Sequence, residues 1–409
     1  MEILYPRCAG IDVHKETLAV CVLIPGPQAE PDKRIEQFGT TTGELRRLRE
    51  WLGAHGVTHA AMESTGVYGK PVFNILESAC QLILVNARHI KQVPGRKTDK
   101  ADCAWIASLL RHGLLEASFV PDAEVRELRD LCRMRTTLVR ECVQVGNRLR
   151  KVLEDANLKL DSVASDALGV SGRSMIRALI EGRDDPAELA ELARGRLRAK
   201  RPELARALEG RVTEHHRFLL RELMRQLEFL EGQVARFEDE IARAMPPFEW
   251  AAELLTTMPG VDRTAACALL AEIGADMTRF ASSRHLASWA GLCPGNNESA
   301  GKRRSGKSHR GNRWIKGVMT EIAWASTRTK NSYSRAQYRK LAGHRGKKRA
   351  LVAVANSLLQ AAWHMLTHRQ TYKDLGAEYL DRLNQKHLER LLIRRLEKLG
   401  HKVILEPVA

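Results

Sequence analysis

The stretch CAGIDVHKETLAVCVLI, residues 8–24, decides the fold of the N-terminal part of the chain. Two apolar runs flank a short polar segment, which predicts two strands joined by a tight turn. Asp12 stands inside the first apolar run, where a carboxylate is costly to bury unless another group compensates it. Asp12 is therefore a candidate functional residue. The alternative is that its side chain only binds the following turn.

Strand patterns alternate with helix patterns over the next hundred residues. Further strands are predicted over 36–40, 58–65 and 81–87, and helices over 43–56, 66–79 and from Lys100 onwards. This alternation indicates an α/β domain with a mixed sheet, in which the first and fourth strands can be neighbours.

Three further acids stand at the ends of these elements. Glu63 lies late in the fourth strand, in AMESTG, and Asp99 and Asp102 lie three residues apart in KTDKADC (97–103), at the start of a helix. Taken singly, Glu63 could cap the helix that begins at Gly66, and the aspartate pair could suit a helix N-terminus. Taken together with Asp12, four acids that converge would repel one another. Two Mg²⁺ ions would neutralise them and form a centre for phosphoryl transfer.

The charge of the chain favours nucleic acid as a partner. The 409 residues carry a net charge of +17, and 44% of them are hydrophobic, which is enough for folded cores. Residues 295–350 hold sixteen Lys and Arg against two acids, Glu298 and Glu321. No long apolar span, lipidation signal or secretory signal is visible, so no membrane partner is expected. The eight cysteines lack C-x-x-C spacing and are expected to be mostly buried thiols in a reducing cytoplasm.

The remainder of the chain is predicted to be helical. Apolar residues at heptad-like spacing predict two long helices packed as a coiled coil, within one chain or between chains. They are Leu131, Leu138, Cys142, Val145, Leu149 and Val152 in one stretch, and Leu220, Leu223, Leu227, Leu230, Val234, Phe237 and Ile241 in the other. The turn at Pro259–Gly260 fits a phosphate-binding helix-hairpin-helix and a simple core turn equally well. The predicted domains are 1–122, 123–248, 249–375 and 376–409.

GIDVHK, MESTG and KTDKADC, in this order and spacing, resemble the RuvC-like domain of the DEDD transposases of bacterial insertion sequences. The resemblance implies a ribonuclease H-like fold, followed by a long coiled-coil insertion and a mainly helical C-terminal transposase domain. It also implies that Asp12, Glu63, Asp99 and Asp102 form the metal-binding tetrad.

The stretch SRHLASWAGLCPGNNESAGKRRSGKSHRGNRWIK (283–316) resembles the C-terminal domain of the same family. A serine in its S-x-G-K stretch attacks DNA in these enzymes, and here that residue is Ser299. A serine is a poor nucleophile alone, but nearby cations can stabilise charge that develops on a phosphoryl group. Ser305 is the second candidate for the nucleophile, and both serines could instead only form hydrogen bonds to phosphates. The predicted nucleic-acid contacts are Lys302, Arg303, Arg304, Lys307, Arg310, Arg313 and Lys316.

The resemblance implies a DNA recombinase that forms a covalent phosphoserine bond with one DNA end, assisted by Mg²⁺, and exchanges strands between the ends of its element and a target. It also implies a guide, a structured noncoding RNA, and a homo-oligomer, a dimer or tetramer. The expected location is the bacterial cytoplasm, at the nucleoid. Two alternatives stay open: a Mg²⁺-dependent junction endonuclease without a serine nucleophile, and a nucleic-acid-binding protein without activity.

Overall fold

The computed structural model describes residues 2–26, 30–63, 66–85, 102–295, 297–299, 302–306, 308, 311–383 and 385–404, without the side chains of 297–299, 302–305 and 386–388. The chain divides into two compact units, residues 1–120 and 121–409. The predicted divisions inside the second unit stay predictions.

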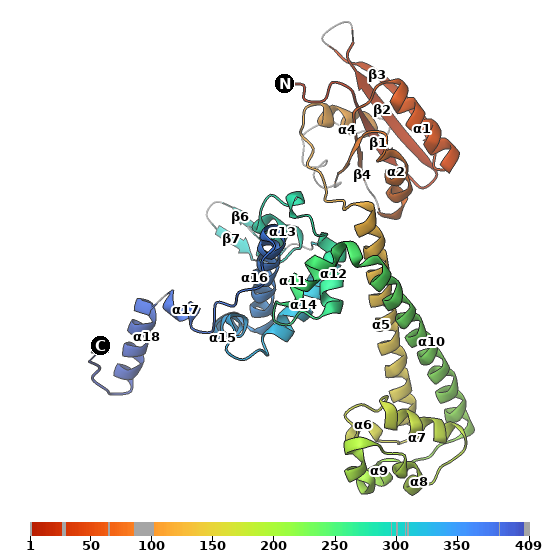
Figure 1. Ribbon diagram of the computed structural model, residues 1–409, viewed down its shortest axis with the longest axis vertical. Coiled ribbons are helices and arrows are strands. Elements are labelled where there is room, and N and C mark those ends of the chain that lie inside the picture. Colours follow the sequence, from red (N-terminus) through yellow and green to blue (C-terminus); the bar gives the residue numbers. More distant parts are fainter. Residues whose placement is uncertain are drawn as a thin grey trace. The chain divides into compact units, whose positions relative to one another are not determined.

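The first unit is built on a five-stranded mixed sheet (Figure 1). Its strands are β1 (Cys8–Val13), β2 (Thr17–Ile24), β3 (Asp32–Gly39), β4 (His59–Glu63) and β5 (Gln81–Val85). The strand order is β3-β2-β1-β4-β5, with β2 antiparallel to both β1 and β3, and with β4 parallel to β1 and β5. The predicted strand–turn–strand over 8–24 is confirmed, and the first and fourth strands are neighbours.

Helices cover both faces of this sheet. Ile11 of β1 packs with Leu48 of α1 (Thr42–Ala54) and Leu76 of α2 (Gly69–Leu76) on one face. Cys8 packs with Ile106 of α4 (Asp102–Arg111) on the other. A short 3₁₀ helix, η1 (Gly66–Tyr68), precedes α2, so the helix predicted over 66–79 begins in two parts. The two core clusters arise because side chains alternate between the faces of a strand.

The second unit begins with a pair of long antiparallel helices, α5 (Ala123–Asp155) and α10 (Glu214–Ala244), which pack side by side (Figure 1). Leu149 and Leu227 are buried between elements of this region, as their spacing predicted. Near the start of α5 the buried residues are Val125, Leu128 and Cys132, whereas Leu131 and Leu138 are half-buried. The buried stripe of α5 therefore differs by a residue from the predicted heptad there.

A cluster of short helices connects the far ends of this pair. It has its own apolar core, to which the ends of α5 and α10 contribute. The elements are α6 (Leu160–Val163), α7 (Val170–Ile180), α8 (Pro186–Glu191), η2 (Gly195–Lys200) and α9 (Arg201–Ala207). Arg173 of α7 fastens the cluster to α10, because its guanidinium donates to both oxygens of Glu231 at 2.5 and 2.6 Å.

The C-terminal part of the unit is a helical bundle with one small hairpin. Its elements are η3 (Pro246–Phe248), α11 (Glu249–Thr256), α12 (Arg263–Ile273), η4 (Met277–Arg279), α13 (Ser283–Trp289), β6 (Asn297–Ser299), β7 (Lys302–Ser305), α14 (Arg313–Ser326), α15 (Tyr333–Arg345), α16 (Lys347–His368), α17 (Tyr379–Arg382) and α18 (Gln385–Lys398). Helix α16 has the length and composition of a membrane span, but it is partly buried and packs against α11, α13, α14 and α15.

The turn at Pro259–Gly260 faces the interior of this bundle. Gly260 has a positive φ of 86°, and a Cβ there would lie 2.6 Å from the backbone oxygen of Ile322 and the backbone nitrogen of Ser326. A turn that packs this tightly on α14 favours the core interpretation over the phosphate-binding one.

Candidate active site

Two of the predicted acids are neighbours on the central strands of the sheet. The parallel pairing of β1 with β4 places Asp12 opposite Glu63. Neighbouring strands lie about 4.8 Å apart, and paired residues share a face. Asp12 follows Cys8 and Gly10 at two-residue spacing, and Glu63 follows Ala61 in the same way, so both acids belong to the face that α4 covers. The register thus brings together acids that stand 51 residues apart along the chain.

Helix α4 lies against β1 because residue 10 is glycine. A Cβ at Gly10 would lie 2.1 Å from the carbonyl oxygen of Cys103 and 2.4 Å from the backbone nitrogen of Ala107. Backbone therefore touches backbone at the point where α4 begins with Asp102. Burial raises the pKa of the Cys103 thiol in this first turn, and the charge of the Asp12 carboxylate acts in the same direction.

Asp12 also has a partner that sequence reasoning missed. His14 Nε2 lies 3.1 Å from Asp12 Oδ2, and the side chain of Asp12 is 15% exposed while that of His14 is 66% exposed. The signal was present in the D-x-H spacing, since residues two apart on a strand share a face. An imidazole at this position can hold one carboxylate oxygen in place or exchange a proton with it.

The donor set of Asp12, Glu63 and Asp102 suits a hard cation. Carboxylate oxygens are the ligands that Mg²⁺ prefers, and Mg²⁺ needs only one or two of them beside water and phosphate. Within the described parts of the chain, no group of three or more His, Cys, Asp or Glu is close enough together to form a metal site. Asp12, Glu63 and Asp102 therefore do not form such a group by themselves. Asp99 lies outside the described residues, so the grouping of all four acids stays a prediction.

The predicted serine lies on the β6–β7 hairpin in the second unit. Ser299 is the last residue of β6 and pairs with Lys302, whereas Ser305 pairs with Asn297 at the opposite end of the hairpin. Arg303 and Arg304 lie on β7; the side chains of Ser299 and of 302–304 are outside the described set, as are Lys307 and Arg310 altogether. The two serines thus differ in place: Ser299 is at the turn and Ser305 at the base.

The two ends of this hairpin segment are fixed to the helices beneath it. Gly311 has a φ of 53°, and a Cβ there would lie 2.5 Å from the backbone of Gly291, so the chain leaving the segment touches the chain entering it. Asn312 caps α14 through its Oδ1, which accepts from the Trp314 backbone N–H at 2.8 Å. Its Nδ2 donates to Glu272 Oε2 at 2.7 Å.

Glu272 is a buried acid that connects this segment to α5. Its residue is 2% exposed, and both its carboxylate oxygens accept hydrogen bonds from Arg133, at 2.7 and 2.8 Å. Arg129 donates to the backbone oxygens of Ala271 and Glu272 at 2.9 and 2.7 Å. Burial lowers the pKa of Arg129 to about 10, although the Glu272 charge opposes that shift. A paired carboxylate of this kind holds its partners in one geometry.

Two of the predicted phosphate contacts, Arg313 and Lys316, lie beside the Glu272 network. The guanidinium carbons of Arg133, Arg140 and Arg313 stand 5.4, 5.3 and 5.0 Å from the centre of the Trp314 ring. Lys316 Nζ lies 3.1 Å from Ser308 Oγ. A ring face within about 6 Å orients a guanidinium without neutralising it. Arg140 was missed because it stands far from the basic stretch in sequence.

Comparisons with known proteins match the part of the chain that holds the paired acids and the part that holds the serine hairpin. A family of DEDD type described as "Transposase" matches residues 9–158, and the family described as "Transposase IS116/IS110/IS902 family" matches residues 252–339. The chain is 23% identical to the transposase of insertion sequence element IS1111A from Coxiella burnetii, over 90% of this chain and 91% of that protein. It is 28% identical to an uncharacterized protein of insertion element IS110 from Streptomyces coelicolor, over 89% of this chain and 95% of that one.

Among solved structures, RuvC of Thermus thermophilus is similar to 27% of this chain over 99% of its own length. The TM-score is 0.21 and the sequence identity is 16%.

Proposed function

Because the chain belongs to the IS116/IS110/IS902 family of transposases, we propose that it cuts and rejoins the DNA of a bacterial insertion sequence through a covalent phosphoserine bond, assisted by Mg²⁺. The observation that carries the metal part is the register of β1 and β4, which pairs Asp12 with Glu63 on the face that α4 covers. Two neighbouring carboxylates repel each other, and a bound cation would neutralise that repulsion.

Asp12, Glu63 and Asp102, together with Asp99, would hold the cation. When bound, Mg²⁺ neutralises these carboxylates and stabilises negative charge on the phosphate that reacts. Asp12 is itself held by His14, which fixes the orientation of one carboxylate oxygen. The ribonuclease H-like fold implied by the sequence agrees with the strand order β3-β2-β1-β4-β5.

Ser299 would supply the nucleophile. Its Oγ loses a proton and forms a bond to phosphorus while one phosphorus–oxygen bond of the DNA breaks, and the released DNA oxygen takes up a proton to become a hydroxyl. The reverse step, attack by a hydroxyl of another strand, restores the serine and needs no external energy. Arg313, Arg140 and Lys316 lie next to the C-terminal end of the serine segment, which is the hairpin region between Gly291 and Gly311. Cations there would stabilise the negative charge of the phosphate that is transferred.

The partners follow from the proposal. The element ends and the target are DNA, a noncoding RNA guides their choice, and a dimer or tetramer in the cytoplasm, at the nucleoid, brings the strands together. The excess of cations in residues 295–350 supports any nucleic acid, since counterion release operates on DNA and RNA alike.

Adduct formation on labelled DNA tests the serine. The DNA carries an element end, the RNA is transcribed from the element's flank, and protein–DNA adducts are separated on denaturing gels. We expect Ser299→Ala to abolish the adduct and Ser305→Ala, a matched change at the other end of the hairpin, to retain it. Adducts that survive in Ser299→Ala would reject the serine assignment, and cleavage without any adduct would favour the junction endonuclease.

Substitution and chelation test the metal. We expect Asp12→Asn to abolish both cleavage and adducts, and a chelator to do the same to the unaltered protein until Mg²⁺ is added back. Full activity in the chelator would end the metal assignment and leave the serine assignment standing.

A further inference from the structure

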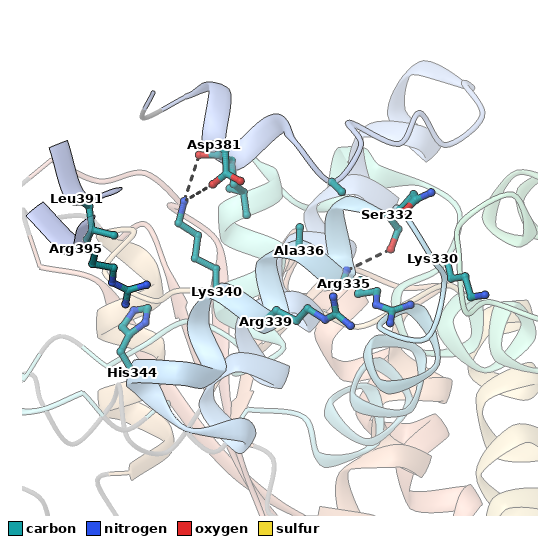
Figure 2. A pocket seen from close by; sticks show the side chains of 13 residues that line it. Lys330, Ser332, Arg335, Ala336, Arg339, Lys340, His344, Asp381, Leu391 and Arg395 are labelled. Atoms are coloured by element: carbon teal, nitrogen blue, oxygen red, sulfur yellow. Dashed lines mark hydrogen bonds and ion pairs between the residues drawn. The ribbon is translucent and has the colours of Figure 1, made fainter. Parts of the chain in front are cut away.

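A cationic groove lies beside α15. Its lining runs from Lys330 to Arg395, so it begins near the end of the region 252–339 that the second family matches and continues past it. It has a volume of about 1050 Å³ and is lined by residues of α15, α17 and α18 and by the loop before α15 (Figure 2). Arg335 and Arg339, four residues apart on α15, share a face, and His344 lines the groove near the end of the same helix. Arg395 comes from α18 and Lys330 from the loop.

The charge of the groove is largely uncompensated. Asp381 is the one acid among the described residues that line the groove, and its carboxylate pairs with Lys340 at 3.5 Å (Figure 2). Among the residues that the structure describes, no carboxylate lies within ion-pair distance of Lys330, Arg335, Arg339 or Arg395. Four like charges around one hollow repel one another unless an anion enters.

The groove is a built feature where α15 and α17 line it, because specific contacts hold these two elements together. The rings of Tyr333 and Tyr379 meet edge to face at 5.9 Å, and the Tyr333 backbone N–H donates to Asp374 at 3.0 Å. Lys340 Nζ also donates to the carbonyl oxygen of Leu380 at 3.3 Å. These contacts fasten α17 and the segment before it onto α15, and α15 also packs on α16.

We infer that this groove binds the phosphodiester backbone of duplex DNA without reading its sequence. Guanidinium groups bind phosphate oxygens in pairs of parallel hydrogen bonds, so arginines suit such a backbone. Grooves for single strands present aromatic rings on which bases stack, and this lining contains none apart from the His344 imidazole. The choice of DNA over other duplexes rests on the proposed function. The groove is a second contact, separate from the serine segment.

The salt dependence of binding tests this inference. Each phosphate contact adds about 0.9 to the slope of log K against log salt, so Arg335→Gln/Arg339→Gln is expected to lower that slope by about 1.8 and to weaken binding roughly 60-fold at 0.1 M salt. Binding of a 30-base-pair duplex of arbitrary sequence is measured by fluorescence anisotropy between about 0.05 and 0.3 M salt. The full chain carries Ser299→Ala in every sample, so that no covalent adduct forms.

The matched control removes the same charge from α18 outside the groove. Arg390→Gln/Arg394→Gln lowers the net charge by the same amount, and we expect its slope to stay within about 0.5 of the parent. Equal slopes for both double variants would overturn the inference, since only overall charge would then act. An effect on an RNA duplex of the same sequence but not on DNA would overturn the choice of DNA. A parent protein that binds no duplex would overturn the proposed function as well.

Discussion

The contact between Gly10 and α4 allows a sharp prediction for the first unit. In Gly10→Ala the new Cβ would stand 2.1 Å from the Cys103 carbonyl oxygen, where ordinary contacts begin at 3.4 Å. Both partners are backbone atoms, which cannot turn aside as a side chain can. Helix α4 must therefore retreat from β1 by about 1 Å, and Asp102 moves with it.

Two magnitudes follow from that displacement. Overpacking of a dense core by one methyl group costs about 1–3 kcal/mol of unfolding free energy, so the first unit should still fold. A misplacement of about 1 Å at a reacting group can lower a rate roughly 100-fold. We therefore expect Gly10→Ala to retain its circular dichroism spectrum, and to lose adduct formation and strand exchange by roughly two orders of magnitude.

Two controls separate geometry from stability. Ile11→Val, on the opposite face of the same strand, should lower the unfolding free energy by about 0.5–1.5 kcal/mol and leave the rate of strand exchange within roughly twofold of the parent. Gly53→Ala on α1, where a Cβ meets nothing within 4 Å, should be neutral or stabilising. Unfolding in urea measures the stability of each variant. A Gly10→Ala protein that exchanges strands at the parental rate would refute the role given to α4.

Two further predictions concern the second unit. Glu272→Ala removes the buried carboxylate that accepts hydrogen bonds from Arg133 and Asn312. Because the Arg133 side chain is 30% exposed and water can solvate it, we expect urea unfolding to show a loss of about 1.5–3 kcal/mol, and a loss under about 1 kcal/mol would contradict the network. The Arg173 guanidinium lowers the pKa of Glu231 below its ordinary value of 4.5. The pair therefore contributes stability above pH 4.5 that is lost as the pH falls through the lowered pKa. Because Glu231 is partly exposed, we expect an acid-dependent loss of at most about 1 kcal/mol, absent in Glu231→Gln.

The first sheet could be predicted because its signals are local. Apolar runs separated by HKET define β1 and β2, and Asp12 and Glu63 stand out because each breaks an apolar run. That these two acids pair depends on a register between strands fifty residues apart, which is set by packing of the whole sheet. The family resemblance supplied what local patterns could not.

The network around Glu272 could not be predicted from the sequence. Arg133, Arg140 and Trp314 come from α5 and α14, far apart along the chain, and meet only because α5 packs on α12. Arginines on a long amphipathic helix ordinarily suggest a solvated face. The groove beside α15 escaped notice for the same reason, since its charge was visible but its second wall, α17 and α18, was not.

The antiparallel pair α5 and α10 acts as a rigid spacer. From Arg133, beside α12, to Asp155 at the small-helix cluster, an α-helix of this length extends about 33 Å. A helix cannot shorten without breaking its backbone hydrogen bonds, and two that brace each other resist bending. Whatever the cluster touches is thus kept at one fixed separation from the serine segment. Removing a matched seven residues from each helix would reduce that separation by about 10 Å.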